Sequence, residues 1–376
     1  MSPKDGFLMS LDSARRKTHF VHYSRRISRY SVRSSGTPTS GSADPSFLGS
    51  GSHQAMQRRS LLAAMLAAPT TARAQHIWRA ERPFRLVVPF APGGALDITA
   101  RLLAREMEPA LGQPIVVENR SGAGGNVGAE AVARAAPDGY TFLISSPGPL
   151  AVNQFVFPSM PYDPETAFSP VVHVVINPVV ILGAPQRPER SFADFLATVR
   201  SGRPVNYSTS GSGGAGHMAM EVLKARLSLP GPQHVPFRGA GPSLQALAGA
   251  QVEFAIESIT SAAGSISAGA ARPLALTTSQ RWRGLPDVPT VQESGVPDFD
   301  FASWTSFVYP RGVPAGAVLA LNSATNLALA KPDVQARLFD LGASPVGGTA
   351  EDLDRFIRSE REKWREAVRI SGARAD

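Results

Sequence analysis

Cysteine is absent from this chain of 376 residues, and so is any apolar run of the length that crosses a bilayer as a helix. The absence of cysteine excludes disulfides, thiol nucleophiles, iron–sulfur clusters and zinc sites made of thiolates. The chain is 43% apolar and holds 34 glycines and 32 prolines. This length and composition are typical of an α/β chain with two domains and many loops.

The net charge of the chain is +8, but residues 75–376 carry no excess of positive charge. Residues 1–74 contain eleven Lys and Arg residues against three Asp residues, so the remainder is neutral overall. A nucleic-acid-binding protein concentrates positive charge on its folded part. The charge distribution therefore argues against a nucleic-acid partner.

Residues 56–74 have the pattern of a secretory signal peptide. Arg58 and Arg59 precede an apolar run at 61–68, and Ala72-Arg73-Ala74 forms a small-x-small cleavage pattern. The apolar run is too short to cross a bilayer. We therefore predict export to the periplasm with cleavage near Ala74, by either the general or the twin-arginine route.

Residues 1–55 precede this segment and are rich in Ser, Arg and Gly, without a hydrophobic period. A signal peptide normally occupies the N-terminus of a chain. We expect synthesis to begin at Met56, which would make 1–55 a non-native, disordered extension. Sequencing of the cellular protein should give a start near Gln75, and residues 1–55 on the mature protein would contradict this expectation.

From residue 85 the chain alternates short apolar runs with longer amphipathic segments. The first block predicts strands at 85–90, 115–118 and 140–145 and helices at 95–111 and 126–136. This order implies a parallel sheet with right-handed crossovers. The next block predicts an apolar stretch at 171–184 broken by Asn177-Pro178, strands at 205–208, 251–256 and 273–277, and a helix at 217–227. Residues 286–297 predict an irregular connection, and helices are expected at 315–330, 334–341 and 350–371.

Two glycine-rich loops, 90–97 and 208–217, each join a predicted strand to a predicted helix. Such loops present free backbone amides at a helix N-terminus, an arrangement that favours anions. The second loop holds four hydroxyl side chains and four glycines. Neither loop carries a convincing nucleotide-binding fingerprint, so no cofactor is expected. Both loops are also compatible with plain tight turns.

Catalytic and metal sites find little support in the sequence. Ser210 and Ser212 lie near glycines, but no matched histidine and acid follow in the order that a hydrolase needs. We expect His217 to orient its loop by hydrogen bonding, and Asp97 to bind amides of the first helical turn. Glu118 and Glu257 are carboxylates at strand ends without a visible partner. The remaining histidines of the mature chain, His76, His173 and His234, lack metal-ligand spacing.

Several motifs in order resemble the tripartite tricarboxylate transporter substrate-binding proteins, also called Bug proteins. The resemblance spans 80–372 and rests on the following segments: RLVVPFAPGG (85–94) with Asp97, VVENRSGAGG (116–125), PDGYT (137–141), LPDVPT (285–290) and GGT (347–349). It implies an α/β, two-lobed type II periplasmic binding fold (Venus flytrap) with two hinge crossovers. Lobe one would comprise 75–175 plus 300–376, lobe two would comprise 176–299, and the hinge strands would be 175–179 and 299–304.

The resemblance also implies an extracytoplasmic solute-binding protein, not an enzyme. It would capture a small organic acid through backbone amides and bridging waters, and deliver this carboxylate as a monomer to the membrane permease subunits of a tripartite transporter. The implied ligand-binding residues are, in lobe one, Pro92, Gly93, Gly94, Asp97, Ser145 and Asn153, and, in lobe two, Ser210, Gly211, Gly213, His217, Arg238, Gly239 and Glu257. No metal site is implied.

Two departures from the family pattern affect these expectations. Ala91 replaces a common Pro, which should leave the amides of the first loop intact. Ile256-Glu257 replaces a common Phe-Asp, so a carboxylate near the cleft is one methylene longer. Two alternatives stay open: a periplasmic sensing subunit for a signalling receptor, and an enzyme on the same fold.

Overall fold

The computed structural model describes residues 78–229 and 231–375, all within one compact unit that spans Ala74–Asp376. The predicted signal peptide at 56–74 and the extension at 1–55 lie outside the described residues. Among the helices of the described part, none combines the length and the apolar character that a membrane span requires.

The first α/β block, residues 84–156, forms one end of the sheet. It consists of β1 (Phe84–Val88), α2 (Ala95–Leu111), β2 (Ile115–Asn119), a short 3-10 turn η1 (Ala123–Gly125), α3 (Asn126–Ala133), β3 (Thr141–Ser145), a π-turn η2 (Gly148–Val152) and α4 (Asn153–Val156). Strand β1 pairs in parallel with β2 and β3, as the strand and helix pattern predicts. The predicted helix at 126–136 ends earlier, because the chain turns after Ala133 toward Gly139.

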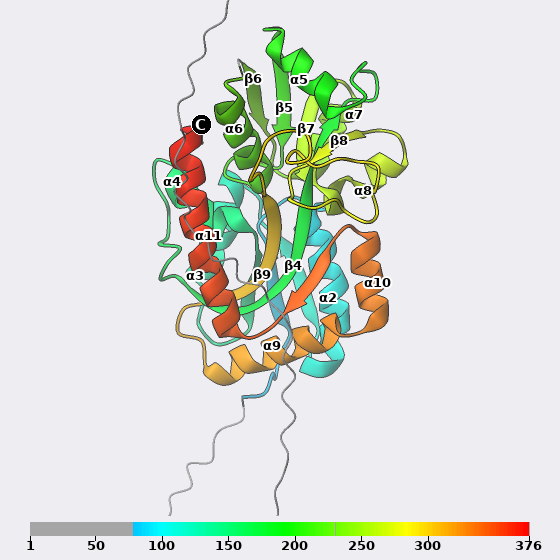
Figure 1. Ribbon diagram of the computed structural model, residues 1–376. Helices are drawn as coiled ribbons and strands as arrows, with labels where there is room; N and C mark the ends of the chain where they lie inside the picture. Colours follow the sequence, from blue (N-terminus) through cyan, green and yellow to red (C-terminus); the bar gives the residue numbers. More distant parts are fainter. Residues whose placement is uncertain (1–77, 230, 376) are drawn as a thin grey trace, which may run out of the picture. The chain divides into compact units, whose positions relative to one another are not determined.

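The long strand β4 (Phe168–Gly183) joins the two halves of the sheet. Up to Pro178 it pairs antiparallel with β9 (Ala302–Pro310). From Val179 onward it pairs antiparallel with β7 (Phe254–Ser258) and β8 (Arg272–Leu276). Our expectation of a break at Asn177-Pro178 was therefore wrong. The missing N–H of Pro178 is tolerated because the strand changes partners at this point. Figure 1 shows β4 and β9 running side by side through the middle of the fold.

The second α/β block, residues 192–276, forms the other end of the sheet (Figure 1). It consists of α5 (Phe192–Arg200), β5 (Val205–Thr209), α6 (Ala215–Leu227), β6 (Pro232–Pro236), α7 (Ala240–Ala248), β7 (Phe254–Ser258), α8 (Ile259–Ser267) and β8 (Arg272–Leu276). Strand β5 pairs in parallel with β6 and β7. Helices α5, α7 and α8 and strand β6 have no counterpart in the sequence prediction.

The chain then returns along β9 to the first α/β block. It ends in α9 (Ala315–Leu329), α10 (Pro332–Asp340), β10 (Ser344–Gly347), which pairs with β4, and α11 (Ala350–Ser371). Helix α11 begins with a reciprocal capping box between Thr349 and Asp352 and ends at Gly372 in the left-handed conformation. It packs against β4 and α6, and so it contacts both halves of the sheet.

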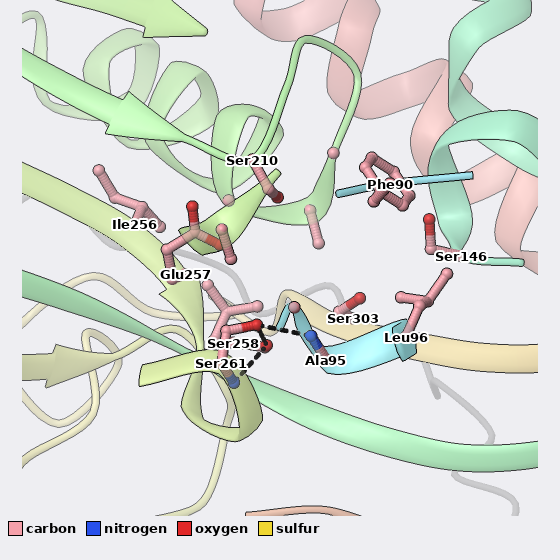
Figure 2. Close-up of a pocket in the computed structure, with 16 residues that line it drawn as sticks. Phe90, Ala95, Leu96, Ser146, Ser210, Ile256, Glu257, Ser258, Ser261 and Ser303 are labelled. Carbon is pink, nitrogen blue, oxygen red and sulfur yellow. Dashed lines mark hydrogen bonds between the residues drawn. The ribbon is translucent and has the colours of Figure 1, made fainter. Parts of the chain in front are cut away.

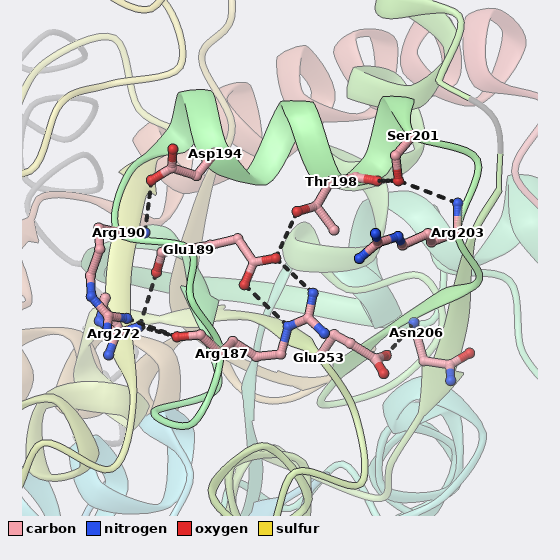
Figure 3. Close-up of polar contacts among 10 residues, drawn as sticks. All are labelled: Arg187, Glu189, Arg190, Asp194, Thr198, Ser201, Arg203, Asn206, Glu253 and Arg272. Atoms are coloured by element: carbon pink, nitrogen blue, oxygen red, sulfur yellow. Dashed lines mark hydrogen bonds and ion pairs between the residues drawn. The ribbon is translucent and has the colours of Figure 1, made fainter.

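A partly buried ion pair fixes the connection from β4 to α5 (Figure 3). Glu189 is 2% exposed, and its carboxylate accepts hydrogen bonds from Nε and Nη2 of Arg187 and from the hydroxyl of Thr198. Arg272 of β8 donates to three backbone carbonyls of the same connection. Because every charged partner is satisfied, this cluster serves the packing of the second α/β block.

Candidate ligand-binding cleft

A cavity of about 60 Å³ lies between the two α/β blocks (Figure 2). One wall comes from Phe90, Gly94, Ala95, Leu96 and Ser146, and β9 adds Ser303. The other wall comes from Ser210, Gly214–Gly216, Ala240 and the stretch that holds Ile256, Glu257, Ser258 and Ser261. At about 10–15 Å³ for each water, the cavity holds roughly five water molecules.

Four helices begin at this cavity. Ala95, Ala215 and Ala240 are the first residues of α2, α6 and α7, and each lines it. Ser258 also lines it and caps the N-terminus of α8 by accepting a hydrogen bond from the N–H of Ser261. The N-terminal end of a helix carries a partial positive charge and unsatisfied N–H groups. The cavity is therefore suited to an anion, although no Lys, Arg or His is among its lining residues.

The two walls touch each other directly. The backbone N–H of Ala95 donates to Oγ of Ser261 at 2.9 Å, and Figure 2 shows these residues facing each other. The N–H of Ala91 donates to the backbone carbonyl of Arg238 at 3.2 Å. These two amides of the first glycine-rich loop are thus bound by the opposite wall, which explains the small volume of the cavity.

Glu257 is the one ionisable residue among those that line the cavity, and it is 3% exposed. Burial raises the pKa of its carboxyl group to about 8, and contacts with Ser243 and Ser210 offset this effect only in part. Its Oε1 atom has no hydrogen-bond partner in the described part of the chain. Within residues 78–229 and 231–375, no three acidic or histidine side chains gather in a way that could hold a metal ion.

Asp97 does not line the cavity, because its carboxylate is held inside the first loop. It accepts hydrogen bonds from the N–H of Gly93 at 2.9 Å, from Nε of Arg101 at 3.0 Å and from Nδ2 of Asn119 at 3.0 Å. Burial alone would raise the pKa of Asp97, but these hydrogen bonds hold the pKa below its usual value. The N–H of Gly93 is consequently occupied within its own loop. The amide that Asp97 binds therefore lies before α2, and not in the first helical turn as expected.

Replacement of Asp97 by alanine should destabilise the protein by about 2–3 kcal/mol, since three donors lose their acceptor. Because the folded protein lowers the pKa of Asp97, this contribution is present above about pH 4 and is lost as the pH falls through the lower folded value. Urea unfolding at pH 7 and pH 3 measures the difference. Asp97→Asn keeps one acceptor oxygen and should lose less unfolding free energy than Asp97→Ala. An equal loss for Asp97→Ala at pH 7 and pH 3 would contradict a stabilising role for the ionised carboxylate.

The second glycine-rich loop is arranged around His217, which is 2% exposed. The N–H of Gly213 donates to Nδ1 of His217 at 3.2 Å, and the ring of His217 stacks on His234 with centroids 4.2 Å apart. The expected hydrogen bond that orients this loop is therefore present. Neither Gly213 nor His217 lines the cavity, so a direct contact with ligand stays a prediction for both.

Gly211 and Arg238, together with Ser210 and Phe90, line a second depression of about 180 Å³ that adjoins the cavity. Its other wall is the glycine-rich segment 122–125. Pro92 and Gly239 line neither space, although Gly239 precedes the first residue of α7. Of the thirteen predicted ligand-binding residues, the structure thus brings Gly94, Ser210 and Glu257 together around the cavity.

Ser145 and Asn153 are both fully buried, and neither lines the cavity. The hydroxyl of Ser145 donates to the carbonyl of Ser146, the neighbour that does line the cavity. Asn153 donates from Nδ2 to the carbonyl of Gly124 at 3.1 Å and to Oδ1 of Asn126 at 2.7 Å. Ser145 therefore supports the wall from behind. Oδ1 of Asn153 instead lies against Gly213 of the second glycine-rich loop and has no hydrogen-bond partner among the described residues.

Several lining residues were not anticipated from the sequence. Ser146, Ser258, Ser261 and Ser303 add hydroxyl groups, and Leu96 and Ala240 add apolar surface. Ser258 and Ser261 could have been found from the sequence, because a serine just after a predicted strand is a typical N-cap and marks the start of a helix, here α8. Ser303 had no such signal, because its place depends on how β9 pairs with β4.

A family model, curated relatives and solved structures all indicate the same protein family. A family model described as "Tripartite tricarboxylate transporter family receptor" matches residues 99–372. Protein BugT of Bordetella pertussis is 36% identical over 296 residues, which cover 78% of this chain and 90% of that protein.

Two solved structures share the fold over nearly their whole length. The periplasmic binding protein BugD matches with a TM-score of 0.76 at 32% identity, covering 79% of this chain and all (100%) of that chain. R. palustris Rpa4515 with adipate also gives a TM-score of 0.76, at 36% identity, covering 79% of this chain and 99% of that chain. The chain therefore belongs to the tripartite tricarboxylate transporter receptor family, the Bug proteins, which are two-lobed α/β solute-binding receptors and not enzymes.

Proposed function

We propose that this protein captures a small organic carboxylate between its two lobes and delivers it to the membrane permease of a tripartite tricarboxylate-type transporter. The observation that supports a carboxylate is the cavity at which α2, α6, α7 and α8 begin, without a basic side chain in its lining. Helix N-termini and backbone amides bind anions without a fixed ion pair. The adipate bound to Rpa4515, a relative of the same fold, agrees with this ligand class.

The proposed lobes are 75–175 plus 300–376 and 176–299, with hinge strands at 175–179 and 299–304. The exchange of pairing partners along β4 at Pro178 supports this division, since strands on either side belong to different parts of the sheet. Pro178 is paired with Ala302 of β9, so both crossovers pass the same level of the sheet. A bend at this level would separate the two walls of the cavity.

The proposed mode of binding starts from the hydrogen bond between the two walls of the cavity. In the proposed mechanism a ligand carboxylate takes the place of Oγ of Ser261 at the N–H of Ala95, and it gains the opposite amides as the lobes close. Differential contacts of this kind shift the population toward the closed form. Gly94, Ser210 and Glu257 contact the ligand in this proposal, and a contact from Gly213 or His217 stays a prediction. The other predicted residues shape the loops and the walls around the cavity.

A thermal-shift screen with adipate, malate and citrate tests the ligand class, with the neutral adipamide as the matched control. At about 100 times Kd a ligand adds about 2.7 kcal/mol of stability, which corresponds to a Tm increase of roughly 5–10 °C. We expect this increase with at least one carboxylate and none with adipamide. Equal shifts with adipamide, or no shift with any organic acid, would contradict a carboxylate receptor.

Substitution of Gly94 tests the position of the ligand. A Cβ atom at this position would lie 3.8 Å from the carbonyl oxygen of Ala91, so Gly94→Ala should fit. Gly94→Val places two further methyl groups beside the cavity and should weaken carboxylate binding by about tenfold, since overpacking costs about 1–3 kcal/mol. Calorimetric titration of both variants measures the difference, and an unchanged Kd for Gly94→Val would place the ligand elsewhere.

Delivery and export need separate tests. Sequencing of the protein isolated from cells should show a start near Gln75, and cross-linking in intact cells should join the ligand-bound protein to a permease subunit. If the ligand-bound form instead cross-links to a signalling receptor, the protein serves sensing and not uptake.

A further inference from the structure

Glu257 places an unpartnered carboxyl oxygen in the cavity wall. The residue lies near the end of β7, one position before the Ser258 cap of α8, and Figure 2 shows its carboxyl group beside Ser210. Ser210 and Glu257 both line the cavity. The Oε1 atom is buried and has no hydrogen-bond partner among the described residues, which is costly for a polar atom. A ligand group that bonds to Oε1 would remove this cost.

No charged side chain of the packed elements neutralises an ionised carboxylate at Glu257, and the helix N-termini at the cavity carry only partial charges. Helices α7 and α8 pack against β7 and contain no titratable residue. The titratable residues of the other elements packed against β7 are His173 of β4, Tyr207 of β5, and His217, Glu221, Lys224 and Arg226 of α6. None of them contributes a charge effect on Glu257, whereas burial raises the pKa of Glu257 to about 8.

The charged groups of α6 already have partners, and Arg226 donates to the backbone carbonyls of Pro297 and Asp298. Nζ of Lys224 forms an ion pair with Glu221, whose carboxylate also accepts a hydrogen bond from the hydroxyl of Tyr207. At neutral pH Glu257 is therefore mostly a neutral carboxylic acid, and its group in the cavity includes an O–H donor. A neutral donor complements a carboxylate and offers little to an ammonium group.

We propose that protonated Glu257 donates a hydrogen bond from Oε1 to a carboxylate oxygen of the ligand, so that the protein binds an organic acid anion together with one proton. This inference rests on the proposed function and specifies the ligand further. The end of the ligand at Glu257 is a carboxylate and not an amine. The ligand class is thus an organic acid without an ammonium group at this end.

The first experiment measures the pH dependence of Kd for adipate and for malate by calorimetry with wild-type protein. Ionisation of Glu257 should weaken binding about tenfold at pH 9 relative to pH 6.5. Titrations of adipate at pH 9 in borate and in Tris buffer should differ in heat by the uptake of nearly one proton, and titrations at pH 6.5 in phosphate and in imidazole buffer should show almost none. A Kd that stays constant from pH 6.5 to 9 for a probe that binds would overturn the inference and leave the proposed function standing.

The second experiment uses Glu257→Gln, whose carboxamide keeps a donor but cannot ionise. At pH 6.5 the Kd should stay within about threefold of the wild type, and the loss at pH 9 should disappear. Glu362→Gln, an exposed change on α11, is the matched control and should keep the wild-type pH profile. If 6-aminohexanoate binds the wild type more tightly than adipate, and Glu257→Gln abolishes that binding, Glu257 acts as an anion and the inference is wrong. If neither adipate nor malate binds the wild type, both this inference and the proposed function fail for these acids.

The pH dependence of the folding stability tests the protonation of Glu257 without any ligand, so it applies even if Glu257→Gln binds no ligand. Because folding raises the pKa of Glu257 from the usual range to about 8, the folded protein keeps a proton that the unfolded chain releases above about pH 4.5. Stability from this residue is therefore complete below pH 4.5 and decreases as the pH rises to about 8. Glu257→Gln should gain stability over wild type progressively across this window, and parallel stability curves would contradict a neutral Glu257.

Discussion

Replacement of Gly124 by alanine should weaken carboxylate binding by about 100-fold, because the two walls could no longer meet. Gly124 lies in the 122–125 segment with φ of +60°, and a Cβ atom there would overlap the backbone carbonyl oxygen of Ser212 in the second glycine-rich loop. A backbone oxygen cannot rotate aside as a side chain can. Overpacking of this kind costs about 1–3 kcal/mol, and 3 kcal/mol corresponds to roughly 100-fold in Kd.

Gly112→Ala is the matched control for this prediction. Gly112 also has a positive φ, +69°, at the end of α2, but nothing lies within 4 Å of its added Cβ. Both variants thus carry similar backbone strain, and only Gly124→Ala separates the walls. Small-angle scattering should give a larger radius of gyration for Gly124→Ala with and without ligand. Wild-type affinity in Gly124→Ala would mean that ligand binds without the contact between Gly124 and Ser212.

The sequence pattern predicted the elements whose hydrophobic period is strong. The helices at 95–111 and 350–371 agree with α2 and α11 at both ends, because Gly112 and Gly372 end them and apolar residues recur on one face. Helices α7 and α8 escaped prediction since they are short and consist largely of Ala, Ser and Gly, with few apolar side chains to mark a face. The continuous strand β4 was misread at Pro178, because a change of pairing partner is invisible in a local pattern.

The candidate cleft was predictable in its loops and not in its contacts. Strand-to-helix loops with glycine indicated where amides gather, and the structure places Gly94 and Ser210 at the cavity accordingly. The pattern could not show that the N–H of Ala95 is bound to Ser261, because 166 residues separate the two. Nor could it show that Glu257 is buried in the cavity wall, and this burial is what raises the pKa of its carboxyl group. Long-range packing decided both.

Removal of the Glu360 carboxylate should strongly lower the stability of the protein. Oε2 of Glu360 accepts two hydrogen bonds, one from the indole N–H of Trp304 in β9 at 2.7 Å and one from the indole N–H of Trp364 in α11 at 2.8 Å. Glu360→Leu leaves two buried donors without an acceptor, at about 1–3 kcal/mol each, so we expect a loss of about 4 kcal/mol. Calorimetry should show a Tm decrease of roughly 8–16 °C.

Glu360→Gln separates the hydrogen bonds from the charge. Its carboxamide oxygen can still accept from both indoles, and only the ion pair with Lys363, at 3.3 Å, is lost. A partly exposed pair of this kind contributes at most about 1 kcal/mol, so Glu360→Gln should stay close to wild type. An equally large loss in both variants would assign the stabilisation to the charge of Glu360. Trp304 precedes Thr305 in β9, and the hydroxyl of Thr305 donates to Asn177 of β4. If Trp304 loses its hydrogen bond to Glu360, the packing of α11 against β4 and β9 should weaken as well. Glu360→Leu should therefore weaken carboxylate binding as well, whereas a purely local defect would leave Kd unchanged.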